Sequence, residues 1–184
     1  MITGIIVIAV VVILLLACVG GYNTLVKGRI TVDEAFSTMD VYLKKRFDLI
    51  PNLVETVKGY AKHESSTLEA VVKMRNVNYG SMSQAEKIEN GTQLSKVLPQ
   101  IFALSESYPD LKANQNFMEL SSQLQKLEDD ISNARRYYNG AVKKYNMSVQ
   151  TFPRNIIAGM FHFETRPMFE VEDTAQRENV QVKF

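Results

Sequence analysis

Residues 117–152 read FMELSSQLQKLEDDISNARRYYNGAVKKYNMSVQTF and carry the clearest periodic pattern in the chain. Apolar or small side chains recur there in alternating steps of three and four residues, as on one face of an α-helix. These positions are Phe117, Leu120, Leu124, Leu127, Ile131, Ala134, Tyr138, Ala141, Tyr145, Ser148 and Phe152. The spacing predicts a helix of about 40 residues, roughly 60 Å long, that begins near Pro109-Asp110 and ends at Phe152, before Pro153.

Two more helices are predicted upstream of this one. The first follows the apolar N-terminus and ends at about Arg75, and Pro51 predicts a kink or short break in it because proline removes an amide donor. Ser83 and Glu86 have the spacing of a capping box, at the start of a third, shorter helix that ends near Tyr108. Three antiparallel helices joined by two short connections predict an all-α, elongated bundle.

The N-terminus carries a long run without a charged side chain. Residues 2–19 read ITGIIVIAVVVILLLACV, and Gly20, Gly21 and Tyr22 extend the run. About 20 residues of helix span roughly 30 Å, the thickness of the hydrocarbon core of a bilayer. We therefore predict an uncleaved transmembrane anchor over residues 1–22. The alternative is a cleaved signal or a lipoprotein signal with Cys18 as the modified residue, but no cation precedes the run and the run is long for a signal.

The cations around the anchor predict its orientation. No Lys or Arg precedes the anchor, whereas Lys27, Arg29 and the cluster at residues 44–46 follow it. Positively charged flanks stay on the cytoplasmic side of a membrane. The body is therefore predicted to be cytoplasmic, with a very short N-terminus outside.

The composition argues against several classes of protein. The 184 residues contain 21 Lys and Arg against 20 Asp and Glu, and this formal net charge of +1 argues against a nucleic-acid binder. One Cys and two His exclude a disulfide framework and argue against a zinc site. His63-Glu64 lacks the second histidine of the zinc-protease motif, since Thr67 stands at that position. We predict no cofactor, no metal site and no catalytic residues.

The chain changes character after Pro153. Residues 155–163 are rich in apolar and aromatic side chains and predict a short helix on the membrane or on the bundle. Residues 168–172 and 180–184 alternate weakly, as strands do, and isolated strands need a partner. We expect this tail either to be disordered or to pair as β-strands between subunits. The predicted domains are an anchor over 1–22, a helical bundle over 23–153 and a tail over 154–184.

Polar residues recur beside the apolar face of the last long helix. Tyr138-Asn139 and Tyr145-Asn146 are one heptad apart, and so are Glu128 and Arg135. Buried asparagines and Arg–Glu pairs specify the alignment of packed helices at some cost in stability. We predict that these residues form a network that sets helix register, because a narrow bundle offers little volume for a ligand site.

The blocks that carry these residues resemble those of the LemA family, in order and in spacing. The resemblance covers nearly the whole chain after the anchor and is weakest over 83–92. The matching positions are Tyr22, Asn23, Arg29, Arg46, Asp48, Pro51, Asn52, Tyr108, Pro109, Glu128, Arg135, Tyr138, Asn139, Tyr145, Asn146 and Pro153. The resemblance implies a single-pass protein of the bacterial inner membrane with a cytoplasmic helical body, and it implies no enzyme activity.

A membrane-anchored rod of this kind predicts a scaffold rather than an enzyme. We expect it to assemble with itself, in a ring-like homo-oligomer, and to organise or remodel the bilayer. The alternative is an adaptor or regulator that presents one face of the bundle to a membrane protease or a signalling partner. A hydrolase or metalloenzyme is the third class, and the sequence offers almost no ligands for it. The predicted partners are other copies, the lipid bilayer and another membrane protein, and no nucleic acid.

Overall fold

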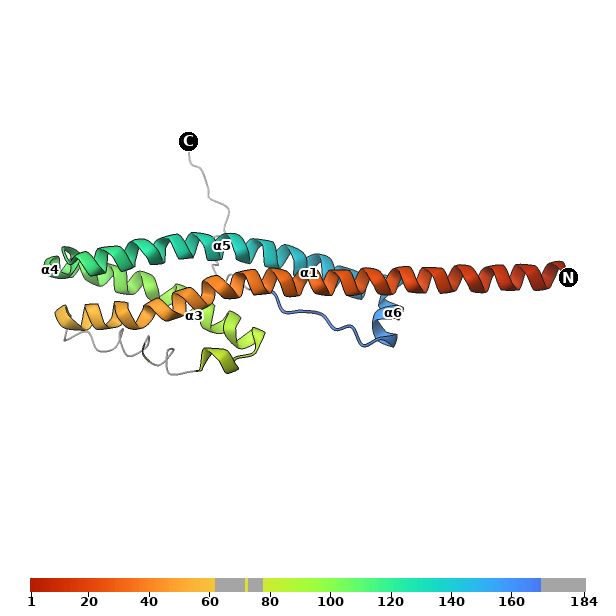
Figure 1. Ribbon diagram of the computed structural model, residues 1–184, viewed down its shortest axis with the longest axis horizontal. Helices are drawn as coiled ribbons and strands as arrows, with labels where there is room; N and C mark the ends of the chain where they lie inside the picture. The colour runs from red at the N-terminus through yellow and green to blue at the C-terminus, as the bar shows by residue number, and fades with distance from the viewer. Residues whose placement is uncertain (62–71, 73–77, 170–184) are drawn as a thin grey trace, which may run out of the picture.

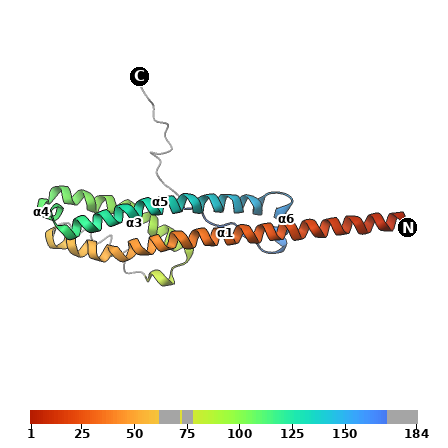
Figure 2. The same cartoon turned by 45° about the horizontal axis from the view of Figure 1, so that its top comes forward.

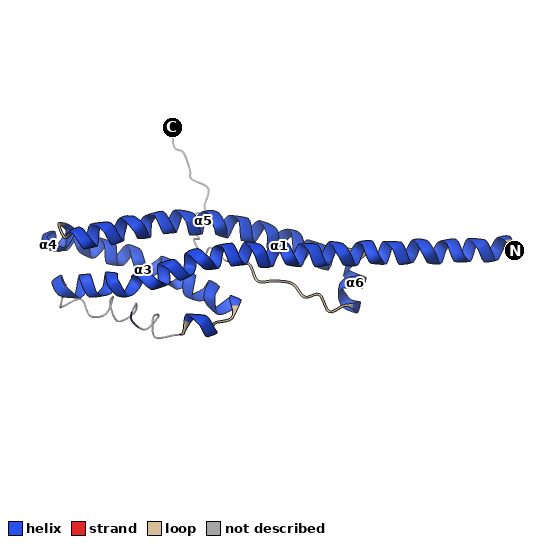
Figure 3. Ribbon diagram, viewed as in Figure 1, coloured by secondary structure: helices blue, strands red, loops and turns tan. Residues whose placement is uncertain are grey.

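The computed structural model describes residues 1–61, 72 and 78–169. Its elements are α1 (Ile2–Tyr60), the 3-10 helix η1 (Tyr79–Ser81), α3 (Gln84–Ser107), α4 (Pro109–Lys112), α5 (Gln115–Gln150) and α6 (Arg154–Met160). Helices account for nearly all of this part of the chain, and no strand occurs within it (Figure 3). The all-α class predicted from the sequence is confirmed. The strand pairing predicted for the tail falls mostly on residues 170–184, outside the described residues.

Helix α1 is a single helix of 59 residues, about 88 Å long. Residues 2–17 at its start are all exposed, and an 18-residue window there has a mean hydropathy of 3.3. This stretch is long and apolar enough to cross a membrane. The helix continues through Tyr22 without a linker, so the apolar segment and the body form one rod (Figure 1).

The structure differs from the sequence-based expectation for α1 in two respects. Of the kink or short break predicted at Pro51, the break does not occur: the helix runs unbroken through the proline, and Ile50, Leu53 and Val54 around it are buried in one core. It also ends at Tyr60 rather than near residue 75, with Ala61 as its C-cap in a non-helical conformation.

Helices α1 and α5 lie side by side and antiparallel over most of the body (Figure 2). Phe36 on α1 meets Tyr138 on α5 edge to face, with ring centroids 5.8 Å apart. Nearer the apolar segment, Gly28 lets α5 approach closely, because a Cβ there would lie 3.1 Å from Cδ2 of Tyr145. The core between the two helices is built from Leu25, Val32, Ala35, Phe36, Met39, Leu43, Ile131, Ala134, Tyr138, Val142 and Tyr145. These α5 residues belong to the predicted apolar face, apart from Val142.

Helix α3 covers the far half of this pair and forms a second core. That core contains Ile50, Leu53, Val54 and Val57 of α1, Leu94, Leu98 and Ile101 of α3, and Leu111, Phe117 and Leu124. Figure 1 shows α3 running in the same direction as α1. The bundle is therefore not antiparallel throughout, as the sequence predicted. Residues 61–83 separate the two helices in the sequence.

The start of α3 is as predicted and the start of α5 is not. Ser83 and Glu86 form the predicted capping box, in which the Glu86 backbone N–H donates to Ser83 Oγ and the Ser83 N–H donates to the Glu86 carboxylate. Helix α5 begins at Gln115 rather than at Pro109-Asp110. Asn114 accepts from the Phe117 N–H at 3.0 Å and caps a new helix, while Pro109 starts the separate turn α4.

Candidate functional site

The extended segment 163–169, the C-terminal strap, leaves α6 and runs back along α5, held by two asparagine side chains. Asn146 donates to the Arg166 carbonyl at 2.9 Å and accepts from the Arg166 N–H at 2.8 Å. Asn139 makes the same pair of bonds with the carbonyl and N–H of Phe169, both at 2.8 Å. The Tyr138 hydroxyl donates to the Pro167 carbonyl at 2.8 Å. The asparagines thus form a network, but with the strap rather than with a neighbouring helix.

The spacing of the asparagines matches the repeat of an extended chain. Seven residues of helix rise about 10.5 Å. Three residues of an extended backbone rise roughly 9–10 Å, and in a polyproline II conformation every third residue points the same way. Two side-chain amides one heptad apart therefore meet residues 166 and 169 with the same geometry. All five bonds go to the backbone of the strap, and the strap side chains add separate contacts, among them an ion pair of 3.6 Å between Arg166 and Asp33 of α1.

Phe169 anchors the far end of the strap. Its ring is buried, and the Arg135 guanidinium carbon lies 3.9 Å from the ring centroid in a cation–π contact. The ring also approaches Gly91 on α3. A Cβ added at Gly91 would lie 3.4 Å from Cζ of Phe169 and 3.0 Å from Cδ2 of Leu43. Glycine is needed at position 91 because α1, the strap and α3 converge there.

Arg46 ties three helices together at the same place. Its side chain is fully buried; Nη2 donates to the Gly91 carbonyl at 2.7 Å, and Nη1 donates to Ser95 Oγ at 2.8 Å. Nη1 also forms an ion pair with the carboxylate of Glu128 on α5. Removing one partner from a buried ion pair is strongly destabilising, because the remaining charge stays out of water. Glu128 therefore pairs with α1 rather than with Arg135 on its own helix.

Arg135 stands beside this pair and is half-buried. Burial lowers the pKa of the Arg135 guanidinium, and the nearby charge of Arg46 lowers it further, while Glu128 opposes the shift. Two guanidinium groups thus lie near one carboxylate, which pairs with Arg46, and the Phe169 ring lies against Arg135. The face of Phe169 supplies part of the negative potential that a second carboxylate would otherwise provide.

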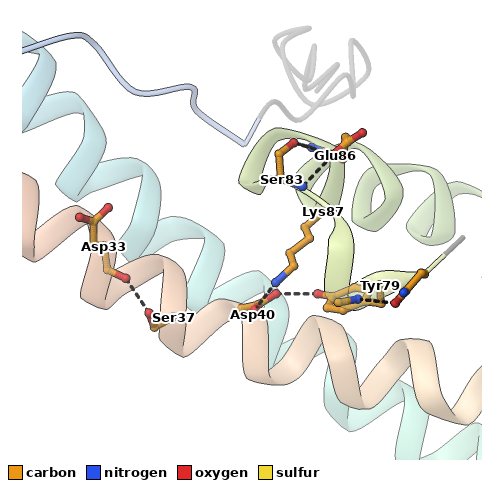
Figure 4. A network of polar contacts seen from close by, with 9 residues as sticks. Asp33, Ser37, Asp40, Tyr79, Ser83, Glu86 and Lys87 are labelled. Carbon is orange, nitrogen blue, oxygen red and sulfur yellow. Dashed lines mark hydrogen bonds and ion pairs between the residues drawn. The ribbon is translucent and has the colours of Figure 1, made fainter.

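A second polar cluster joins η1 and α3 to α1 (Figure 4). The Tyr79 hydroxyl donates to Asp40 Oδ1 at 2.7 Å, and Lys87 Nζ lies 2.7 Å from Asp40 Oδ2. Burial raises the pKa of the Tyr79 hydroxyl well above its usual range, and the bond to Asp40 raises it further. The Lys87 ammonium also lies 4.9 Å from the centre of the Tyr79 ring. This cluster fixes the start of α3 on α1.

The structure brings six of the residues predicted to matter into one region and spreads the others along the chain. The six are Arg46, Glu128, Arg135, Tyr138, Asn139 and Asn146. Near the apolar segment, Tyr22 meets Phe161 and Phe163 edge to face, and Arg29 lies 5.2 Å from the Phe163 ring centroid. Tyr145 packs against Gly28 in the core between α1 and α5.

The remaining predicted positions serve local structure. Asp48 pairs with Lys44 on the same helix face. Tyr108 and Pro109 begin α4, and Pro153 precedes α6. Asn23 is exposed, and Asn52 lines an open groove between α1 and α5. Pro51 lies inside α1.

Sequence reasoning missed Gly91, Ser95 and Phe169, which complete the main cluster. Phe169 lies in a weakly alternating tail, and no local signal links it to Arg135. In the sequence, Gly91 stood out only as a residue that weakens the predicted helix. Across residues 1–61, 72 and 78–169, no group of three His, Cys, Asp or Glu side chains is placed to hold a metal ion. The arrangement holds an extended backbone and locks three helices.

Comparisons with known proteins place these features in a family. The model of the LemA family matches residues 35–184. Protein LemA of Metamycoplasma hominis is 23% identical over 156 residues, which cover 84% of this chain and 71% of that protein. Magnetosome proteins MamQ 1 and MamQ 2 of Paramagnetospirillum magneticum are each 22% identical over 175 residues, covering 81% of this chain. The chain spans 64% of the length of each MamQ protein.

Proposed function

The chain belongs to the LemA family, and from this premise we propose that it is a non-enzymatic, membrane-anchored scaffold. In this proposal the apolar part of α1 spans the bacterial inner membrane, with a short N-terminus outside and the helical body in the cytoplasm. Copies of the protein assemble with one another, in a ring-like form, and organise or remodel the bilayer.

The unbroken course of α1 carries the proposal. One helix of 59 residues contains both the apolar segment and the first helix of the body. Local stiffness of a helix transmits the orientation of one end to the other, whereas a flexible linker would uncouple them. A body rigidly joined to its anchor can hold neighbouring anchors at a fixed spacing and angle, which is what a scaffold must do to shape a membrane.

Exposed apolar side chains on the body offer surfaces for contact between copies. Ile30 and Val41 are both about half exposed, and they lie eleven residues apart on α1. Eleven residues are close to three helical turns, so the two side chains share one face. Tyr137 is exposed on α5. Apolar side chains that recur on one face favour lateral packing between parallel rods.

The relatives' names agree with a structural role. Both MamQ proteins are named magnetosome proteins. That name states an association with a cellular structure rather than a reaction. The cations Lys27 and Arg29, which follow the apolar segment, support the cytoplasmic placement of the body.

The test is the particle mass and shape of the full-length protein in native-lipid nanodiscs, by mass photometry and electron microscopy. We expect discrete particles of many times the chain mass of 20.8 kDa. The variant Val41→Glu should shift them to smaller particles, and Gln125→Glu, which adds the same charge at an exposed position of α5, should not. Particles of one chain each, in native lipid, would contradict the scaffold.

An adaptor is the second candidate, and an open groove favours it. The groove lies between α1 and α5, has a volume of about 450 Å³ and is lined by Lys45, Asp48, Leu49, Gln123, Lys126 and Leu127. Its mixed apolar and charged lining suits a peptide or helix of another membrane protein. Single-chain particles together with a partner that cross-links specifically to Lys126 would favour the adaptor over the scaffold.

A further inference from the structure

Helix α6 lies across α1 at the point where the apolar segment ends (Figure 1). Ile157 of α6 packs directly on Gly21, and a Cβ at Gly21 would lie only 2.3 Å from Cδ1 of Ile157. Phe161, just after α6, meets Tyr22 with ring centroids 4.8 Å apart. If α1 stands along the membrane normal, α6 lies close to the membrane plane, at the level of the headgroups.

The side of α6 that faces away from α1 is apolar and uncovered. Ile157 and Ala158 are buried, whereas Ile156 and Met160 are 55% and 64% exposed. Phe152 and Phe161 flank the helix and are 79% and 49% exposed. Ile156 and Met160 lie four residues apart and so share a face. This apolar surface adjoins the apolar segment of α1, which is itself exposed.

The charges of the chain are strongly polarised toward this end. Residues 1–32 and 140–163, which lie at this end, contain no Asp or Glu and five cations: Lys27, Arg29, Lys143, Lys144 and Arg154. The whole chain has a formal charge of +1, so the remaining residues carry 1 − 5 = −4. The cations are also gathered in space. Lys27 and Lys144 line one groove between α1 and α5, and Lys143, Lys144 and Arg154 line another.

We infer that residues 152–161, with Lys27, Lys143 and Lys144, form a foot that docks onto the anionic leaflet where α1 leaves the membrane. The exposed Phe152, Ile156, Met160 and Phe161 enter the boundary between headgroups and acyl chains, as the apolar face of an interfacial helix does. The cations bind lipid phosphates, and each lies close enough to the surface to feel its potential. The acidic remainder of the body is repelled, so the rod stands off the surface.

This inference rests on the membrane anchoring of the proposed function and is independent of self-assembly. A foot on one side of the anchor occupies area in a single leaflet and fixes the tilt of the rod. Both effects would let a scaffold impose curvature.

The absence of tryptophan from the chain makes a clean test possible. Phe152→Trp places one reporter on the foot, and Tyr137→Trp places a control on an exposed position of α5 farther from the anchor. Each full-length variant is inserted at one copy per nanodisc, with either phosphatidylcholine alone or an added anionic phosphatidylglycerol. Tryptophan emission and quenching by lipids brominated near the top of the acyl chain are then measured, with helix content checked by circular dichroism.

We expect the Phe152→Trp emission to shift to the blue and to be quenched, and the Tyr137→Trp emission to remain unquenched. Quenching should increase with phosphatidylglycerol. Replacing Lys143, Lys144 and Arg154 by Gln in the reporter variant should weaken docking by about fivefold for each cation removed. Gly21→Leu should displace α6 and lower the quenching, whereas Gly20→Leu, at a position with no atom within 4 Å of its Cβ, should not.

Three results would overturn the foot. Water-like, unquenched emission from Phe152→Trp would show that the face stays in solvent. Blue-shifted emission without bromine quenching would show that protein rather than lipid covers the face. Quenching that changes neither with phosphatidylglycerol nor with the three Gln substitutions would show that the cations do not contribute to docking. Because one copy per nanodisc cannot assemble, failure of the foot and failure of the scaffold are measured separately.

Discussion

The asparagine pair on α5 makes the sharpest prediction, because each asparagine holds one residue of the strap. Asn139→Leu removes the two bonds to Phe169, and Asn146→Leu removes the two bonds to Arg166. A net contribution of about 1 kcal/mol per hydrogen bond gives about 2 kcal/mol for each substitution. That value corresponds to about 30-fold more frequent opening of the strap. The asparagines are about 10 Å apart, so the double variant should be nearly additive.

Amide hydrogen exchange of the full-length protein in nanodiscs measures this opening directly. The N–H groups of Arg166 and Phe169 donate to the asparagine side chains, so their protection should fall by about 30-fold in the matching variant. Asn133→Leu is the control, because Asn133 is an exposed asparagine of the same helix that bonds to Arg136. Leaving the strap protected while exchange rises in α1 and α5 would refute the reasoning, and would show that the asparagines set helix register.

Three further predictions concern the stability of the body, measured by urea or thermal unfolding of the detergent-solubilised chain. Glu128→Gln should lower the free energy of unfolding by about 2–3 kcal/mol, below the usual 3–5 for a buried pair, because the Glu128 side chain is 32% exposed. Replacing Arg46 by Met as well should restore part of the loss. A double variant as unstable as the sum of its two single variants would contradict this prediction. The free energy of unfolding should fall above about pH 10, because Tyr79 loses its proton there in the unfolded chain, whereas its raised pKa keeps it protonated in the folded protein. This site contributes a slope of about 1.4 kcal/mol per pH unit, which should vanish in Tyr79→Phe. Gly91→Ala should destabilise the protein by about 1 kcal/mol or more, because the added Cβ has close neighbours. Gly140→Ala, whose Cβ has open space around it, should stabilise the protein by about 1 kcal/mol. Similar effects at the two sites would argue against the convergence of α1, the strap and α3 at Gly91.

Local patterns in the chain were sufficient to predict the helices and the candidate span. The alternation from Phe117 onward marked the face of α5 that is buried, and the Ser83–Glu86 spacing marked the start of α3. Such signals act between residues a few positions apart, so they can be recognised in the sequence alone. Proline was a weaker guide: α1 has no break at Pro51, and α5 begins at the Asn114 cap rather than at Pro109-Asp110.

The candidate site could be predicted only in part, because its contacts join residues that are far apart in the sequence. Arg46, Glu128, Arg135 and the two asparagines were identified as positions, but their partners were not. Arg46 and Glu128 are 82 positions apart, and Asn139 and Phe169 are 30 apart. No local spacing encodes contacts between such distant residues, because they exist only after helices and strap have been brought together.

Periodicity, charge and apolar length in the sequence thus specify an α-helical rod with a membrane-compatible end. The direction of α3, the choice of Arg46 as partner for Glu128 and the docking of the strap on α5 come from long-range packing. Each depends on burial of groups that lie far apart along the chain, and burial is a property of the folded molecule as a whole.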